Sequence, residues 1–146
     1  MIRRAQAHEW QNLRDIADDA YAKYTPLIGK KPAPMLADYK AHIRDDSVFV
    51  YDNDTDILGF AVVVHQIDGY WLETIAVLPE QQGQGIGKAL MVAVDDYIGM
   101  FAASYQLYTN VVMTEAAAWY DRLGFDQIEI KKIAGYQRIY FQKTLK

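Results

Sequence analysis

A glycine-rich loop joins an apolar strand pattern to a helix near the middle of the chain, and this feature restricts the fold most. Residues 70–78 alternate as a strand, and a stripe of apolar residues at helical spacing begins at Ile86. Between them lie Gly83 and Gly85, and Gly87 follows in the first helical turn. Glycines let a ligand approach the backbone closely, and the first N–H groups of a helix lack partners within it. The pattern predicts a phosphate or pyrophosphate site; a simple glycine-rich turn is the alternative.

Two familiar phosphate-binding loops do not match this segment. The dinucleotide fingerprint G-x-G-x-x-G fails because, counted from Gly83, its last position is Lys88. The nucleoside-triphosphate loop G-x-x-x-x-G-K-[ST] has Gln82 at its first glycine and Ala89 at its hydroxyl position. The sequence therefore supports neither a nicotinamide-dependent enzyme nor a nucleoside triphosphatase.

The remaining segments predict a mixed sheet with helices on it. Helical spacing predicts helices over 8–24, 35–44, 86–100 and 115–123, and strand patterns cover 2–6, 47–51, 57–66, 70–78, 105–109, 125–133 and 136–142. The proline-rich segment 25–34 is predicted to be a loop that covers a substrate. We expect one α/β (α+β) domain over residues 1–146, with a mostly antiparallel sheet of about seven strands flanked by helices. A crossover makes strands 70–78 and 105–109 parallel.

Composition narrows the classes of partner. The chain has 146 residues and a net charge of −4, which argues against a dedicated nucleic-acid binder. It has no cysteine, which excludes disulfides and thiolate chemistry. The longest apolar run, 57–64, is too short to cross a bilayer, and no apolar stretch follows the first residues. We therefore expect a cytoplasmic protein with no membrane and no nucleic-acid partner.

The three histidines do not suggest a metal site. His8, His42 and His65 are scattered along the chain and have no metal-ligand spacing. The acidic run 52–56 resembles the start of a calcium loop, but Ile57 stands where the turn needs glycine. A solvated hairpin turn is the better interpretation, and no metal is predicted.

Three motifs that lie in register resemble one family. Gln82-x-x-Gly85-x-Gly87 resembles the Q/R-x-x-G-x-G/A signature of the GNAT superfamily, the acetyl-CoA-dependent N-acetyltransferases. The stretch Leu-Glu-Thr-Ile-Ala-Val-Leu-Pro-Glu at 72–80 resembles that family's central strand and its V-x-P exit. Tyr-Asp-Arg-Leu-Gly-Phe at 120–125 resembles its Y-x-x-L-G-F element.

The resemblance implies a site for acetyl-CoA. Strands 70–78 and 105–109 would splay apart, and the backbone of Ile75, Ala76 and Val77 would pair with the pantetheine arm. The Val77 N–H would also stabilise the oxyanion. The pyrophosphate would lie on the N–H groups of the loop, which comprises Gln82, Gly83, Gln84, Gly85, Ile86, Gly87 and Lys88.

The sequence matches the family pattern at one more residue and departs from it at two positions. Asn110 ends the fifth predicted strand, where the family often carries Asn and uses it to contact the cofactor. A second family Asn is replaced by Met113, which puts one side-chain contact to the pantetheine arm in doubt. The arginine common beside the glycine loop is absent, so phosphate binding would rest on N–H groups and Lys88.

Two residues are candidates for acid–base catalysis. By the resemblance, Tyr120 would protonate the departing thiolate and also contact the cofactor; the alternative is a tyrosine packed in the core. Glu73 is the candidate base, because it interrupts an apolar strand on the same alternation face as Ile75 and Val77. A carboxylate in such a cleft would have a raised pKa, whereas a strand Glu that faces solvent would not.

The sequence thus predicts an acyl-CoA N-acyltransferase that moves an acetyl group from acetyl-CoA directly to a primary amine in a ternary complex. A non-catalytic acetyl-CoA-binding or regulatory module is the alternative, and a plain interaction domain is the second. The acceptor stays open among a small amine or amino acid, a polyamine, and a protein amino group. Eleven tyrosines exceed what a small core readily hides, so a homodimer through 125–142 is also predicted.

Overall fold

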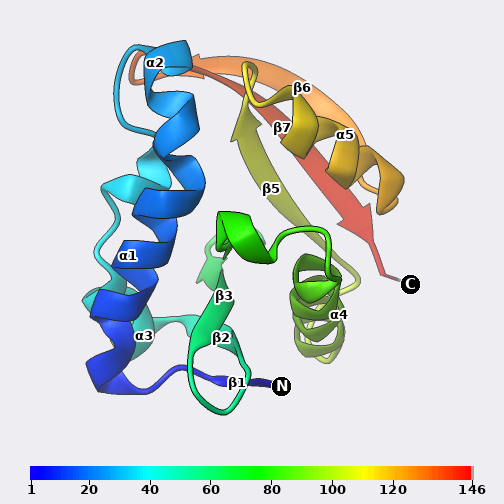
Figure 1. Cartoon of the computed structure of the whole chain (residues 1–146). Coiled ribbons are helices and arrows are strands. Elements are labelled where there is room, and N and C mark those ends of the chain that lie inside the picture. The colour runs from blue at the N-terminus through cyan, green and yellow to red at the C-terminus, as the bar shows by residue number, and fades with distance from the viewer. Residues whose placement is uncertain (146) are drawn as a thin grey trace.

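Strands β1 to β7 form one mixed sheet in the order β1-β2-β3-β4-β5-β7-β6 (Figure 1). The structure is a computed structural model that describes residues 1–145. The strands are β1 (Ile2–Arg4), β2 (Ser47–Asp52), β3 (Ile57–Gln66), β4 (Gly69–Val77), β5 (Ser104–Asn110), β6 (Asp126–Ile133) and β7 (Tyr136–Thr144). The helices are α1 (Trp10–Tyr21), α2 (Thr25–Ile28), α3 (Tyr39–Asp45), α4 (Ile86–Gly99) and α5 (Thr114–Arg122). The predicted α/β class and the seven strands are confirmed.

The helices cover the two faces of this sheet (Figure 1). Leu13, Ile16 and Ala17 of α1 pack with Val62 and Ala76 into a core on one face. A second core on the other face holds the buried side of α4 together with parts of β5, α5 and β7. Two separate cores form because helices pack on both faces of the sheet, which lies between them.

β4 and β5 are parallel, as the crossover through α4 requires, but they pair only briefly. The one registered pair between them is Trp71 with Gln106, near the start of both strands. Beyond that point the two strands diverge, and the splayed pair expected from the resemblance is confirmed. β5 continues instead into seven antiparallel pairs with β7.

The N-terminal helices differ from the sequence prediction. The expected helix over 8–24 is α-helical only in α1, because 3₁₀ turns replace its ends at Ala7–Glu9 and Ala22–Tyr24. The segment 25–34, expected to be a loop, contains the short helix α2, which ends at Gly29 with a φ of +86°.

The helix expected over 35–44 begins later, because the Asp38 side chain accepts a hydrogen bond from the Ala41 N–H and caps α3.

Over residues 1–145, no helix is both long enough and apolar enough to span a membrane. Among these same residues, no cluster of three acidic or histidine side chains could hold a metal ion.

Candidate active site

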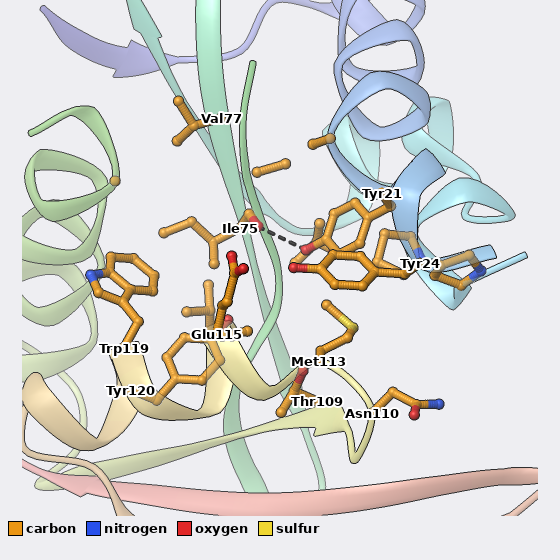
Figure 2. Close-up of a pocket in the computed structure, with 18 of the residues that line it drawn as sticks. Tyr21, Tyr24, Ile75, Val77, Thr109, Asn110, Met113, Glu115, Trp119 and Tyr120 are labelled. Carbon is orange, nitrogen blue, oxygen red and sulfur yellow. Dashed lines mark hydrogen bonds between the residues drawn. The ribbon is translucent and has the colours of Figure 1, made fainter. Parts of the chain in front are cut away.

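A cavity of about 600 Å³ opens where β4 and β5 diverge, a volume typical of small-molecule sites. Its walls come from four parts of the fold. One wall is the segment from the end of α1 to Ala37, and the opposite wall is α5. β4 and the glycine loop form its back, and β5 and β7 close the remaining side. Figure 2 shows Tyr21 and Tyr24 on one side of this space and Trp119 and Tyr120 on the other.

The glycine loop presents free backbone donors to this cavity. Gly83 and Gly85 have φ values of +83° and +84°, a conformation that other residues adopt only with strain. Gly85 is the N-cap of α4, so the N–H groups of the first helical turn have no helical acceptor. No atom lies within 4 Å of a Cβ built on Gly83 or Gly85, which leaves the outside of the loop open. The loop therefore suits an anionic group at the positive end of the helix dipole.

Gly87 is required for a different reason. A Cβ at this position would lie 3.2 Å from Cζ2 of Trp119, so the glycine allows the indole ring to pack against the first turn of α4. This contact joins the glycine loop to α5 across the cavity. Trp119 was not predicted from the sequence, where it appears as an ordinary helix residue.

The free edge of β4 faces the cavity. The Leu78 N–H donates to the Leu58 carbonyl over 3.0 Å, so by the alternation of an antiparallel ladder Ala76 also pairs with β3. Ile75 and Val77 then turn their N–H and C=O groups toward the gap left by β5. The backbone of Ala76 was expected to face the gap as well, but it belongs to the β3 side, and Ala76 contributes only its side chain to the lining.

Two side chains bind the carbonyl groups of this edge. The Tyr21 hydroxyl donates to the Ile75 oxygen over 2.8 Å, drawn as the dashed line in Figure 2. The Gln82 amide donates to the Val77 oxygen over 3.2 Å. The N–H groups of Ile75 and Val77 remain available to a ligand, which is the arrangement that an added strand or a developing oxyanion needs.

Glu73 lies in the cavity wall, but not where strand alternation predicted. Val62 pairs with Thr74 while Val63 pairs with Leu72, so a β-bulge leaves Glu73 without a partner on β3. Ile75 packs on the α4 side, whereas the charged neighbours of Glu73 are His42 of α3, Asp46 and Arg138 of β7. The expected common face with Ile75 and Val77 is therefore wrong, because the bulge interrupts the alternation. Burial raises the pKa of the Glu73 carboxyl, and His42 and Arg138 partly oppose this rise.

Tyr120 is 7% exposed and lines the cavity from α5. Its ring packs between Phe125 and Phe141, with centroids 5.6 and 5.7 Å away. Burial raises the pKa of its hydroxyl well above the ordinary value for tyrosine. Tyr120 is therefore packed in the core, as the alternative interpretation of the sequence expected, and it also lines the cavity.

The other predicted cofactor residues have different positions. Gln82, Gly83, Gly85, Ile86, Gly87 and Lys88 line the cavity, whereas Gln84 of the same loop does not. The side-chain oxygen of Asn110 accepts from the Val112 N–H over 3.1 Å, and its amide points away from the centre of Figure 2. Met113 is buried at the start of α5 beside the Thr109 hydroxyl, 3.6 Å from its sulfur, so it offers no amide donor.

Several lining residues carry no local sequence signal. Lys23 and Glu115 form an exposed ion pair of 3.6 Å that spans from η2 (Ala22–Tyr24) to α5. Arg122, one turn beyond Trp119, also lines the cavity. It adds a cation to a site that lacks the arginine common beside the glycine loop. Only the three-dimensional contact between these distant segments identifies them.

Comparison with known proteins gives one family. A model described as the acetyltransferase (GNAT) domain matches residues 44–127. No curated protein sequence matches the chain.

Several solved structures share the fold. PaiA N-acetyltransferase from Thermoplasma acidophilum in complex with coenzyme A is 16% identical, with a TM-score of 0.81, over 99% of this chain and 98% of that one. An N-acetyltransferase from Staphylococcus aureus is 18% identical, with a TM-score of 0.76, over 100% and 98%. A GNAT-family acetyltransferase from Bacillus cereus is 18% identical, with a TM-score of 0.75, over 99% and 96%.

Proposed function

Because this chain belongs to the GNAT acetyltransferase family, we propose that it moves an acetyl group from acetyl-CoA directly to a primary amine. The observation that carries the proposal is the single cavity in which the open glycine loop, the free edge of β4 and Tyr120 meet. A phosphate site alone would require only the loop. A binding module would need neither a carboxyl with a raised pKa nor a hydroxyl in the same space, so the enzyme is favoured over the non-catalytic alternative.

The residues of the cavity suit a coenzyme A molecule. The N–H groups of Ile86, Gly87 and Lys88 at the start of α4 would hold the pyrophosphate, with Lys88 and Arg122 as cations at the same cavity. The free N–H groups of Ile75 and Val77 would receive the pantetheine arm as an extra strand. When bound, the cosubstrate supplies an activated acetyl group.

Three groups of the chain would then act on the reaction. The Val77 N–H would donate a hydrogen bond to the oxygen on which negative charge develops, the role of an oxyanion-hole donor. Glu73 would accept a proton from the acceptor ammonium, directly or through water, and its raised pKa makes it a stronger base than an ordinary carboxylate. As the carbon–nitrogen bond forms and the carbon–sulfur bond breaks, Tyr120 would donate its hydrogen bond to the sulfur.

The burial of Tyr120 bears on its proposed role as a hydrogen-bond donor to the sulfur. Since its pKa is raised, the hydroxyl is protonated at every pH at which the enzyme would work. A thiolate of pKa ~8.5 is a weaker base than this phenolate. Tyr120 would therefore share its proton with the departing sulfur through a hydrogen bond. The amine loses a proton as the amide forms, and this proton balances the negative charge of the released thiolate.

A direct transfer in a ternary complex is favoured by the composition of the chain. The chain has no cysteine that could carry the acetyl group between two half-reactions. The one cavity is lined both by α5 and by the segment from the end of α1 to Ala37, so we propose that donor and acceptor bind in it together. Two substrates bound together gain the rate advantage of proximity without a covalent enzyme intermediate.

Two measurements test this function. Coenzyme A and acetyl-CoA should both raise the melting temperature of the protein, since each binds only the folded state. Thiol release from acetyl-CoA in the presence of an amine panel should then exceed the rate without amine. Stabilisation by coenzyme A without amine-dependent thiol release would favour the non-catalytic module.

We also propose several further properties of the protein that follow from its sequence. They are the single domain over residues 1–146, a cytoplasmic location, no metal, no nucleic-acid or membrane partner, and a homodimer. The dimer has a structural candidate, because β6 is the last strand of the sheet and exposes Ile128 and Ile130. An apolar edge strand is a template for pairing with another copy.

A further inference from the structure

Arg138 presents an unpaired cation to the cavity from β7. Its guanidinium carbon lies 4.1 Å from the ring centroid of Tyr108 and 5.5 Å from that of Tyr136. Across the part of the chain that the structure describes, no carboxylate lies within ion-pair distance of it. Stacking on two tyrosine faces holds the guanidinium in place and leaves the edge with its N–H donors for a ligand.

Glu73 supplies the opposite charge on the same side of the sheet. It lines the same cavity, and the Arg138 charge acts to lower the pKa of its carboxyl, although the two side chains form no ion pair within residues 1–145. Tyr108 lies near both, since the charges of Glu73 and Arg138 act on its hydroxyl in opposite directions. The wall thus holds one anion and one cation, and within residues 1–145 neither of them forms an ion pair.

Lys30 and Lys31 lie at the hairpin that carries Arg138, outside the cavity lining. The Lys30 ammonium lies 3.9 Å from the Tyr136 ring centroid and 3.2 Å from the Ala134 carbonyl oxygen. The Tyr136 hydroxyl donates to the Lys31 carbonyl over 3.0 Å and holds the backbone of that residue beside the same β6–β7 hairpin. A polyamine, which carries several positive charges, would meet the positive charges of Arg138 and Lys30 at this hairpin, whereas a carboxylate would be attracted.

We propose that the acceptor is a small amino acid, whose carboxylate binds the Arg138 guanidinium and whose amino group lies beside Glu73. The planar fork of an arginine matches the two oxygens of a carboxylate. The ammonium that must lose a proton is then beside the base that would take it. This inference rests on the proposed function and names the substrate class of the same site.

Matched acceptors test the proposal. Thiol release from acetyl-CoA would be measured with the twenty standard amino acids, their amides, and amines that lack the carboxylate, with a polyamine included. For the best acceptor, the amide should have a kcat/KM roughly 10–10²-fold lower than the acid, the range for losing a hydrogen bond to a charged group.

Variants of Arg138 then test whether this residue causes the preference for the acid over the amide. Arg138→Gln should lower kcat/KM for the acid to about the value for its amide and leave the amide nearly unchanged. Arg138→Lys should retain part of the preference, because an ammonium keeps the charge and loses the fork. Lys132→Gln is the matched control, since it removes one exposed cation of the same hairpin that does not line the cavity.

Several outcomes would overturn the proposal. They are equal use of acid and amide by the wild-type protein, a polyamine as the best acceptor, an equal loss for both acceptors in Arg138→Gln, or no acid accepted although coenzyme A binds. If Arg138→Gln fails to fold, the acid–amide comparison in the wild type and in Arg138→Lys still decides. Failure of coenzyme A to stabilise the protein would refute the proposed function itself, and this inference with it.

Discussion

The Tyr21 hydroxyl donates a 2.8 Å hydrogen bond to the Ile75 carbonyl and joins the end of α1 to the free edge of β4. The two residues are far apart in the sequence, and Figure 2 shows the bond as a dashed line at the side of the cavity. It fixes the wall that carries Tyr24 against the strand that would receive the pantetheine arm. The position of α1 and the shape of the site are therefore mechanically linked.

Removing this hydroxyl tests the link. Tyr21→Phe should lower the free energy of unfolding by about 0.5–1.5 kcal/mol, the usual net value of one hydrogen bond, measured by urea denaturation. Because the wall is then less fixed, KM for the acceptor should rise more than kcat falls. Tyr24→Phe is the control, since its hydroxyl also faces the cavity and Figure 2 shows no hydrogen bond from it. Equal stability loss in both variants would contradict the specific role of Tyr21.

The function of Tyr120 can be separated from its packing. Tyr120→Phe keeps the ring contacts with Phe125 and Phe141, so melting temperature and coenzyme A binding should change little. Once an acceptor is known, kcat should fall by ~10²–10⁴, as for the loss of a general acid, with little change in KM. Tyr97→Phe, which removes a hydroxyl outside the cavity, should keep full kcat. Full kcat in Tyr120→Phe would show that another group serves the thiolate.

Valine substitutions in the glycine loop should abolish stabilisation by coenzyme A. In Gly87→Val the new side chain meets Trp119 and pushes either the ring or itself into the cavity. In Gly85→Val the left-handed φ of +84° adds strain of roughly 1–2 kcal/mol, so the apparent melting temperature should fall as well. Thermal shift with and without coenzyme A measures both effects.

Gly99→Val is the matched control, because it lies in the last turn of the same helix and meets only an ordinary contact with Leu145. Unchanged coenzyme A affinity in Gly87→Val would refute the assignment of the loop.

The raised pKa of Glu73 predicts a pH-dependent stability. The folded state binds the Glu73 proton more tightly than the unfolded state, so ionisation costs folding free energy. This contribution is favourable below the unfolded pKa of about 4.3 and is lost as pH rises through the folded pKa. Glu73→Gln should therefore be more stable than wild type in urea near neutral pH, and the difference should vanish toward about pH 4. Glu80→Gln, on the exposed turn after β4, should show no such pattern; the same pH trend there would rule out burial as the cause.

The dimer proposal is tested at the exposed edge of the sheet. Ile130 is 53% exposed on β6, so Ile130→Lys should convert a dimer to a monomer in light scattering at micromolar concentration. Val92→Lys is the control, because Val92 is similarly exposed on α4, away from that edge. A wild-type protein that is already monomeric would remove the proposal.

Much of the fold follows from local patterns in the sequence. Apolar alternation and helical spacing are short-range properties, and they located α4, β4 and β5 within one or two residues. The order of these elements required a crossover, which made β4 and β5 parallel. The glycines after β4 indicated an anion site for a local reason, because positive φ and free helix N–H groups depend on neighbouring residues alone.

The prediction failed where the backbone geometry depends on strand alignment or on a helix cap. The bulge at Glu73 cannot be read from the strand pattern, because it depends on how β3 and β4 align. The start of α3 was misplaced because the Asp38 cap competes with helical spacing that begins earlier. The surplus of tyrosine is explained in part by the cavity, whose lining includes Tyr21, Tyr24, Tyr108, Tyr120 and Tyr136.

By itself, then, the sequence determined the class of fold, the glycine loop and the candidates Tyr120 and Glu73, since each rests on neighbouring residues or a short motif. Only the tertiary structure decided what surrounds them. It brought Tyr21 to Ile75, Trp119 to Gly87 and Arg138 to the side of Glu73, all over long separations in the chain. Such contacts depend on how the strands splay and how the helices pack, and these are set by the whole core rather than by any one segment.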